Sequence, residues 1–145
     1  MNLGYIKAAY NTDYLRATLA LAAGTYMNTN YAAEQNTLKN IYEASVGIKI
    51  SKKHSLWIDA GLMPAHLGFE SAIGKDNWTL TRSLAADNSP YFETGASLSY
   101  TTASGRWSLR GSVLNGWQRI QRVDGNSSPA FGHQLTYTPS ESWSF

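Results

Sequence analysis

Apolar and polar side chains alternate with a period of two residues along most of this 145-residue chain. A period of two places successive side chains on opposite faces of a β-strand, and no segment fits a helical period as well. In residues 42–50 one face would carry Tyr42, Ala44, Val46, Ile48 and Ile50, and the other Glu43, Ser45, Gly47 and Lys49. The alternation predicts about seven strands near residues 3–10, 15–23, 42–50, 56–63, 92–100, 107–113 and 131–137.

The predicted connections alternate between short and long. Tight turns are expected near residues 11–13, 51–54, 101–105 and 138–141, and long loops over residues 24–40, 64–90 and 115–129. All long loops therefore lie at one end of an up-and-down antiparallel sheet. Outer-membrane barrels have this arrangement, with short periplasmic turns and long extracellular loops.

Aromatic residues gather at the predicted strand ends, as in the two girdles that flank the apolar band of a membrane barrel. One group brackets the tight turns and another lies toward the long loops. The first comprises Tyr10, Tyr14, Tyr100, Trp107, Tyr137 and Trp143, and the second Tyr42, Tyr91, Phe92, Trp117 and Phe131.

Composition excludes several other classes of protein. The 12 basic and 10 acidic residues are scattered, whereas a nucleic-acid-binding protein gathers its basic residues on one face. No apolar run reaches the roughly 18–20 residues of a membrane-spanning helix. There is no cysteine, and the three histidines lack metal-ligand spacing. No nucleophile elbow or phosphate-binding glycine loop appears, so we expect neither an enzyme nor a cofactor.

A soluble lipocalin-like barrel that binds a small molecule would alternate in the same way, with its apolar side chains inside. The loop rhythm favours the membrane barrel. So do the many alanines on the apolar face, which would fill a protein core poorly but are adequate against lipid: Ala8, Ala17, Ala23, Ala44, Ala60 and Ala96. We therefore predict an all-β, transmembrane, up-and-down barrel of which residues 1–145 form one incomplete segment.

Several short motifs resemble those of the OmpL-like family of β-barrel porins. They include Gly68-Phe69-Glu70, Ser89-Pro90-Tyr91 and Asn115-Gly116-Trp117, in that order, within a resemblance over roughly residues 41–140. The resemblance implies a single-chain outer-membrane barrel considerably longer than this chain, so that the chain would be an internal or truncated segment of about half a barrel. It implies no catalytic motif and no particular solute.

The charged residues on the polar face are the candidate functional residues, because charges that line a pore bias its ion selectivity. Four cations against three anions predict weak selectivity, slightly for anions. The alternative is that these residues pair across the wall and only rigidify it. The predicted lumen-lining residues are Lys7, Arg16, Glu43, Lys49, Asp59, Glu93 and Arg110.

The loop over residues 64–90 is the second candidate, because long loops are uncommon unless they have a function. It is expected either to fold into the lumen as a constriction or to pack externally on its own aromatics. Its candidate residues are Phe69, Glu70, Asp76, Trp78 and Arg82.

Together these features predict a porin-like channel in the bacterial outer membrane, for passive diffusion of small hydrophilic solutes or ions. Its partners would be the lipid bilayer and those solutes, with no nucleic acid. A non-conducting outer-membrane barrel that binds a surface ligand through its long loops remains the alternative.

Overall fold

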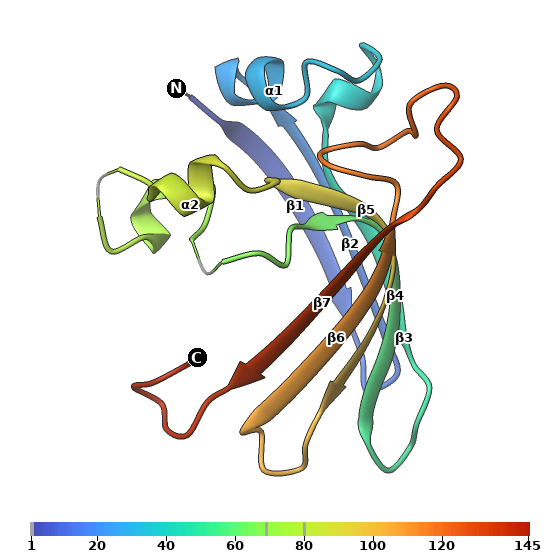
Figure 1. Cartoon of the computed structure of the whole chain (residues 1–145), viewed down its shortest axis with the longest axis vertical. Coiled ribbons are helices and arrows are strands. Elements are labelled where there is room, and N and C mark those ends of the chain that lie inside the picture. Colours follow the sequence, from blue (N-terminus) through green and yellow to red (C-terminus); the bar gives the residue numbers. More distant parts are fainter. Residues whose placement is uncertain (1, 69, 80) are drawn as a thin grey trace.

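A computed structural model describes residues 2–68, 70–79 and 81–145, and within them seven strands form one antiparallel sheet in sequence order (Figure 1). Each strand pairs with its neighbour in the chain. The strands are β1 (Gly4–Asn11), β2 (Leu15–Ala23), β3 (Ile41–Lys49), β4 (Ser55–Pro64), β5 (Phe92–Thr101), β6 (Trp107–Leu114) and β7 (Ala130–Tyr137). The predicted all-β, up-and-down fold is confirmed, and most strand boundaries agree within one or two residues.

Tight turns join the strands at one end and long loops at the other (Figure 1). The long loops contain short helices, which the alternation did not predict: α1 (Thr25–Asn30) and the 3₁₀ turn η1 (Leu38–Asn40) lie between β2 and β3, and the 3₁₀ turn η2 (Gly74–Asp76) and α2 (Leu84–Asp87) between β4 and β5. No helix in the described part of the chain is both long and apolar enough to cross a membrane.

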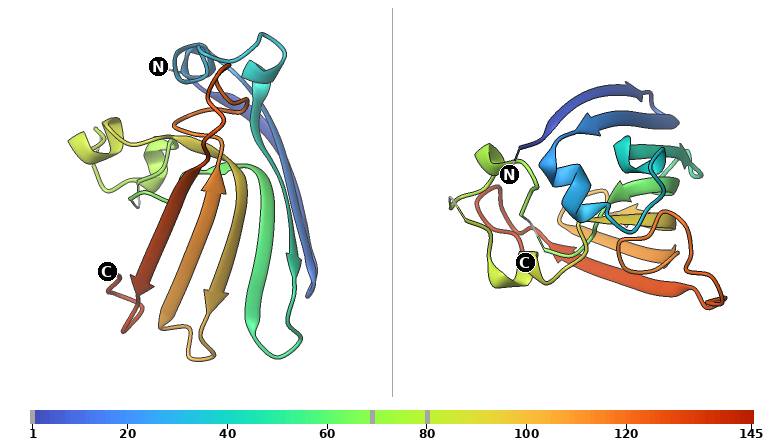
Figure 2. Two further views of the ribbon diagram at one scale, coloured as in Figure 1. Left: turned by 45° about the vertical axis from the view of Figure 1, so that its right-hand side comes forward. Right: turned by 90° about the horizontal axis from the view of Figure 1, so that it is seen from above.

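The sheet is curved and does not close (Figure 2). Its convex face carries exposed apolar side chains, and its concave face carries the polar residues and the loop between β4 and β5. Large exposed residues of the convex face are Ile6, Leu19, Leu21, Val46, Ile48, Ile58, Leu98, Leu109, Val113, Phe131 and Leu135. Such a row of exposed large apolar side chains is costly in water, so this face is suited to an apolar environment.

The prediction that Tyr42 lies on the apolar face is wrong. The register between β2 and β3 pairs Ala20 with Glu43 but the next residue, Leu21, with Ile41, so Tyr42 is an extra residue in a β-bulge. Its ring stacks on that of Tyr5, 5.7 Å between centroids, and lines a cleft on the concave face.

The prediction that Phe92 belongs to an exposed girdle is also wrong, because β4 and β5 curve over at their long-loop ends (Figure 1). Gly61 and Gly95 pair directly across these two strands, and both have positive φ, 129° and 158°. Beyond them Leu62 and Phe92 are buried, and the Phe92 ring stacks on Tyr31 at 4.1 Å. The small core thus lies beneath the loops at this end of the sheet.

Candidate functional site on the concave face

The strand register places all seven predicted lumen-lining residues on one face of the sheet. Lys7 in β1 is linked to Glu43 in β3 through Ala20 in β2, which pairs with both. In the same way Arg16 in β2 is linked to Asp59 in β4 through Gly47 in β3. Lys49 in β3 is linked to Arg110 in β6 through Trp57 in β4 and Ser99 in β5. Glu93 in β5 pairs with Met63, which lies on the same face of β4 as Trp57. Paired residues share a face, so these charges share the concave one. That they line an aqueous lumen remains a prediction.

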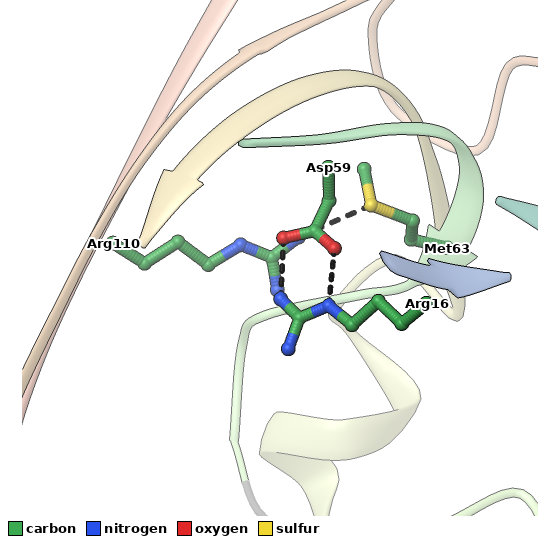
Figure 3. A network of polar contacts seen from close by, with 4 residues as sticks. All are labelled: Arg16, Asp59, Met63 and Arg110. Atoms are coloured by element: carbon green, nitrogen blue, oxygen red, sulfur yellow. Dashed lines mark hydrogen bonds and ion pairs between the residues drawn. The ribbon is translucent and has the colours of Figure 1, made fainter. Parts of the chain in front are cut away.

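Four of the seven form two ion pairs, each of which spans an intervening strand. Lys7 Nζ lies 2.7 Å from Glu43 Oε2. Arg16 donates to both carboxylate oxygens of Asp59, through Nε at 2.6 Å and a terminal nitrogen at 2.5 Å (Figure 3). A forked arginine–carboxylate pair fixes the orientation of both side chains.

Gly47 makes room for the second of these pairs. It lies between Arg16 and Asp59 in the sheet, and a Cβ built there would collide with Asp59 Oδ1 and approach Arg16 Cγ to 2.9 Å. Arg16 also lies over the Trp57 ring, 4.4 Å from its centroid. In the sequence Gly47 is only a small residue in an alternating strand. Its role follows from its pairing with Arg16 and Asp59, which the alternation does not predict.

Glu93 pairs with His66, which the sequence places in a loop and to which it assigns no function. His66 Nδ1 lies 2.7 Å and 2.9 Å from the two carboxylate oxygens of Glu93, and both side chains are buried. The Gln134 amide donates to the His66 carbonyl at 2.6 Å, and the imidazole lies against Gly132. The loop that leaves β4 is thereby attached to the concave face of β5 and β7.

Arg110 and Lys49 are not brought into any ion pair within the described residues. The Arg110 side chain extends along the wall to the Met63 sulfur, 3.9 Å from a terminal nitrogen (Figure 3). A thioether is a weak acceptor. The Nε of Arg110 is buried and has no hydrogen-bond partner in the described chain.

Among the described residues, the structure brings together only two of the predicted constriction residues, Glu70 and Arg82, which line the same cleft. Glu70 accepts hydrogen bonds from the backbone N–H and hydroxyl of Ser83, the N-cap residue that precedes α2. The Arg82 guanidinium lies 4.3 Å from the Tyr91 ring centroid. Asp76 is exposed, and Trp78 is 99 % exposed. Phe69 lies outside the described residues.

Glu70 and Arg82 line a cleft of about 480 Å³ between the β4–β5 loop and the concave face of the sheet. The wall contributes Tyr5, Lys7 and Glu43.

The loop between β2 and β3 supports the wall at this end. Tyr31, in that loop, donates from its hydroxyl to the Tyr42 carbonyl at 3.2 Å. Burial raises the pKa of the Tyr31 hydroxyl well above its usual value, so the hydroxyl stays protonated as a donor.

A second cleft of about 340 Å³ adjoins the first, and the two share Glu43, Pro64 and Ala65. It contains Arg16, Asp59 and Arg110 together with several hydroxyl groups. No group of three metal-ligating side chains occurs in residues 2–68, 70–79 and 81–145.

A comparison with protein families matches residues 1–145 to the model described as "Putative beta-barrel porin-2, OmpL-like". No curated protein and no solved structure gives a significant match.

Proposed function

Because the chain belongs to the OmpL-like β-barrel porin family, we propose that it forms part of a channel in the bacterial outer membrane through which small hydrophilic solutes and ions diffuse. The proposal assigns the convex face to lipid and the concave face to an aqueous lumen. It requires no cofactor and no catalytic step.

The distribution of polarity between the two faces is the observation that carries the proposal. Both ion pairs between residues of the described strands lie on the concave face, and the convex face presents large aliphatic side chains. Lipid offers no hydrogen bonds, so an apolar outer surface and a charged inner surface suit a pore wall. In a soluble barrel the apolar face would be the concave, inner one. In this structure the concave face instead carries the ion pairs.

Among the described residues β1 and β7 are the two edge strands of the sheet, and these open edges support a larger barrel. In a membrane each edge must find a partner, because exposed backbone N–H and C=O groups are costly there. Both strands run from the long-loop end to the tight-turn end, so direct pairing between them would be parallel. Antiparallel closure therefore takes an odd number of further strands. The backbone of Phe145 exchanges two hydrogen bonds with Tyr137, 2.8 and 2.9 Å, in the manner of a following strand.

Conductance of the full-length protein in a planar lipid bilayer tests the proposal. We expect ohmic single-channel steps whose ion selectivity changes when Arg16 and Arg110 are both replaced by glutamine. A substitution in an exposed tight turn, Lys53→Gln, serves as the control and should leave the steps unchanged. Silence after verified insertion would overturn the channel function and favour a barrel that binds ligands through its loops.

A further inference from the structure

The three carboxylates on the concave face of the strands each have a basic partner, whereas Arg110 has no acidic partner within the described residues. Glu43 is paired with Lys7, Asp59 with Arg16 and Glu93 with His66. Within the described residues no carboxylate oxygen lies within 4.0 Å of Arg110. The wall therefore holds a guanidinium whose charge no neighbouring carboxylate contacts.

Part of the Arg110 guanidinium is buried, so the lack of an acidic partner is not made up by water. Its Nε is shielded from solvent without a hydrogen bond in the described chain, and one terminal nitrogen reaches only the Met63 sulfur, at 3.9 Å. A buried donor without an acceptor destabilises a protein, because it has lost its hydrogen bonds to water. An oxyanion in the cleft that Arg110 lines would not reach this shielded Nε, but it would accept hydrogen bonds from the terminal nitrogens of the guanidinium.

The cleft beside Arg110 has the size and chemistry for such a ligand. Its volume of about 340 Å³ accommodates a small organic anion, and Arg16 contributes a second guanidinium, which its forked pair with Asp59 holds in place (Figure 3). Hydroxyl groups that can donate to an anion line the same cleft: Thr18, Ser45, Ser97 and Ser99.

The neighbouring cleft extends the same chemistry toward the long-loop end. Arg82 lines it, lies over Tyr91, and has a buried Nε without a hydrogen-bond partner in the described chain. The two clefts share Glu43, whose charge Lys7 offsets at 2.7 Å. An anion that enters past Arg82 would thus reach the adjoining cleft, which Arg16 and Arg110 line.

We propose that Arg110 is the centre of an oxyanion-binding site on the pore wall, which takes small solutes that carry a carboxylate or a phosphate group. The fork of N–H donors on a guanidinium matches both groups. The proposal rests on the channel function above and specifies the class of solute that the channel would favour.

Titration of the purified full-length protein in detergent with inorganic phosphate and, separately, with acetate tests the site without requiring conduction. Arg110→Gln should weaken binding of the preferred anion at least about tenfold, since hydrogen bonds to charged groups contribute this much or more. Arg110→Lys keeps the charge but loses the fork and should lie between. Arg106→Gln, in the exposed turn between β5 and β6, should bind like the wild type.

Equal binding by the wild type and Arg110→Gln, or no binding of either anion by the folded wild type, would overturn the site. Circular dichroism verifies folding of each variant. Planar-bilayer recordings separate this failure from failure of the channel function. If the protein gives ohmic steps but its anion binding does not depend on Arg110, only the site is refuted. If anion binding depends on Arg110 but no steps are seen, only the channel function is refuted.

Discussion

Gly132 lies directly against the imidazole of His66, so that a Cβ at position 132 would come within 2.5 Å of His66 Cε1. A glycine in β7 thereby makes room for a loop residue that follows β4. Together with the His66–Glu93 hydrogen bonds, this contact holds the start of the β4–β5 loop inside the curve of the sheet.

Replacing Gly132 by valine should therefore detach this loop. The added side chain would displace His66 from Glu93, at a cost of about 1–3 kcal/mol in the free energy of unfolding. Limited proteolysis should then cleave faster within residues 65–90. Gly111→Val is the matched control, because Gly111 has open space around its Cβ position. Equal proteolysis of both variants would show that the loop is not held by this contact.

Gly61→Ala should destabilise the sheet at the point where β4 curves over. Gly61 has φ of 129°, and a Cβ there would collide with the Ala44 carbonyl oxygen. A non-glycine residue in such a strained conformation costs about 1–3 kcal/mol. Urea unfolding in lipid vesicles measures the loss, and Gly4→Ala, with no atom closer than 4.0 Å, should have a much smaller effect. Similar midpoints for the two variants would argue against the curved end of β4 and β5.

Asp59→Asn should increase anion selectivity by leaving Arg16 without its counter-charge. In a salt gradient the reversal potential of the channel should shift toward the equilibrium potential of the anion. Asp13→Asn removes the same charge from an exposed tight turn and serves as the control. No difference between the two variants would mean that the Arg16–Asp59 pair lies outside the ion path.

An arginine on the convex face should impair insertion far more than one on the concave face. Leu19 is 51 % exposed on the convex face, and Ala9 lies at a similar height on the concave face of β1. A charge on the lipid side near the bilayer midplane costs about 2–4 kcal/mol. Leu19→Arg should therefore reduce folding into lipid vesicles, while Ala9→Arg should fold nearly as well as the wild type. The opposite order would mean that the concave face, and not the convex face, contacts lipid.

Local sequence pattern predicted the strands and most residues of each face, because alternation and turn length are properties of contiguous residues. It did not predict features that depend on pairing between distant segments. The bulge at Tyr42 depends on the register with β2, and the curve at Gly61 depends on Gly95 across the sheet.

The candidate site divides in the same way. The charged face was evident from the alternation, but the attachment of His66 to Glu93 joins residues 27 positions apart and required the folded chain. The spacing of the loop residues did not indicate that Asp76 and Trp78 would be exposed while Arg82 lined a cleft.

A single-cysteine scan along β2 tests the central claim most directly, since the chain has no cysteine of its own. Each position from 15 to 23 would carry a fluorophore in the reconstituted full-length protein, with nitroxide-labelled lipids as the quencher. We predict that lipid quenches the label at the odd positions, which lie on the convex face, and at none of the even positions from Arg16 to Ala22. Lipid quenching at the even positions, or at no position along β2, would contradict the assignment of the convex face to the membrane.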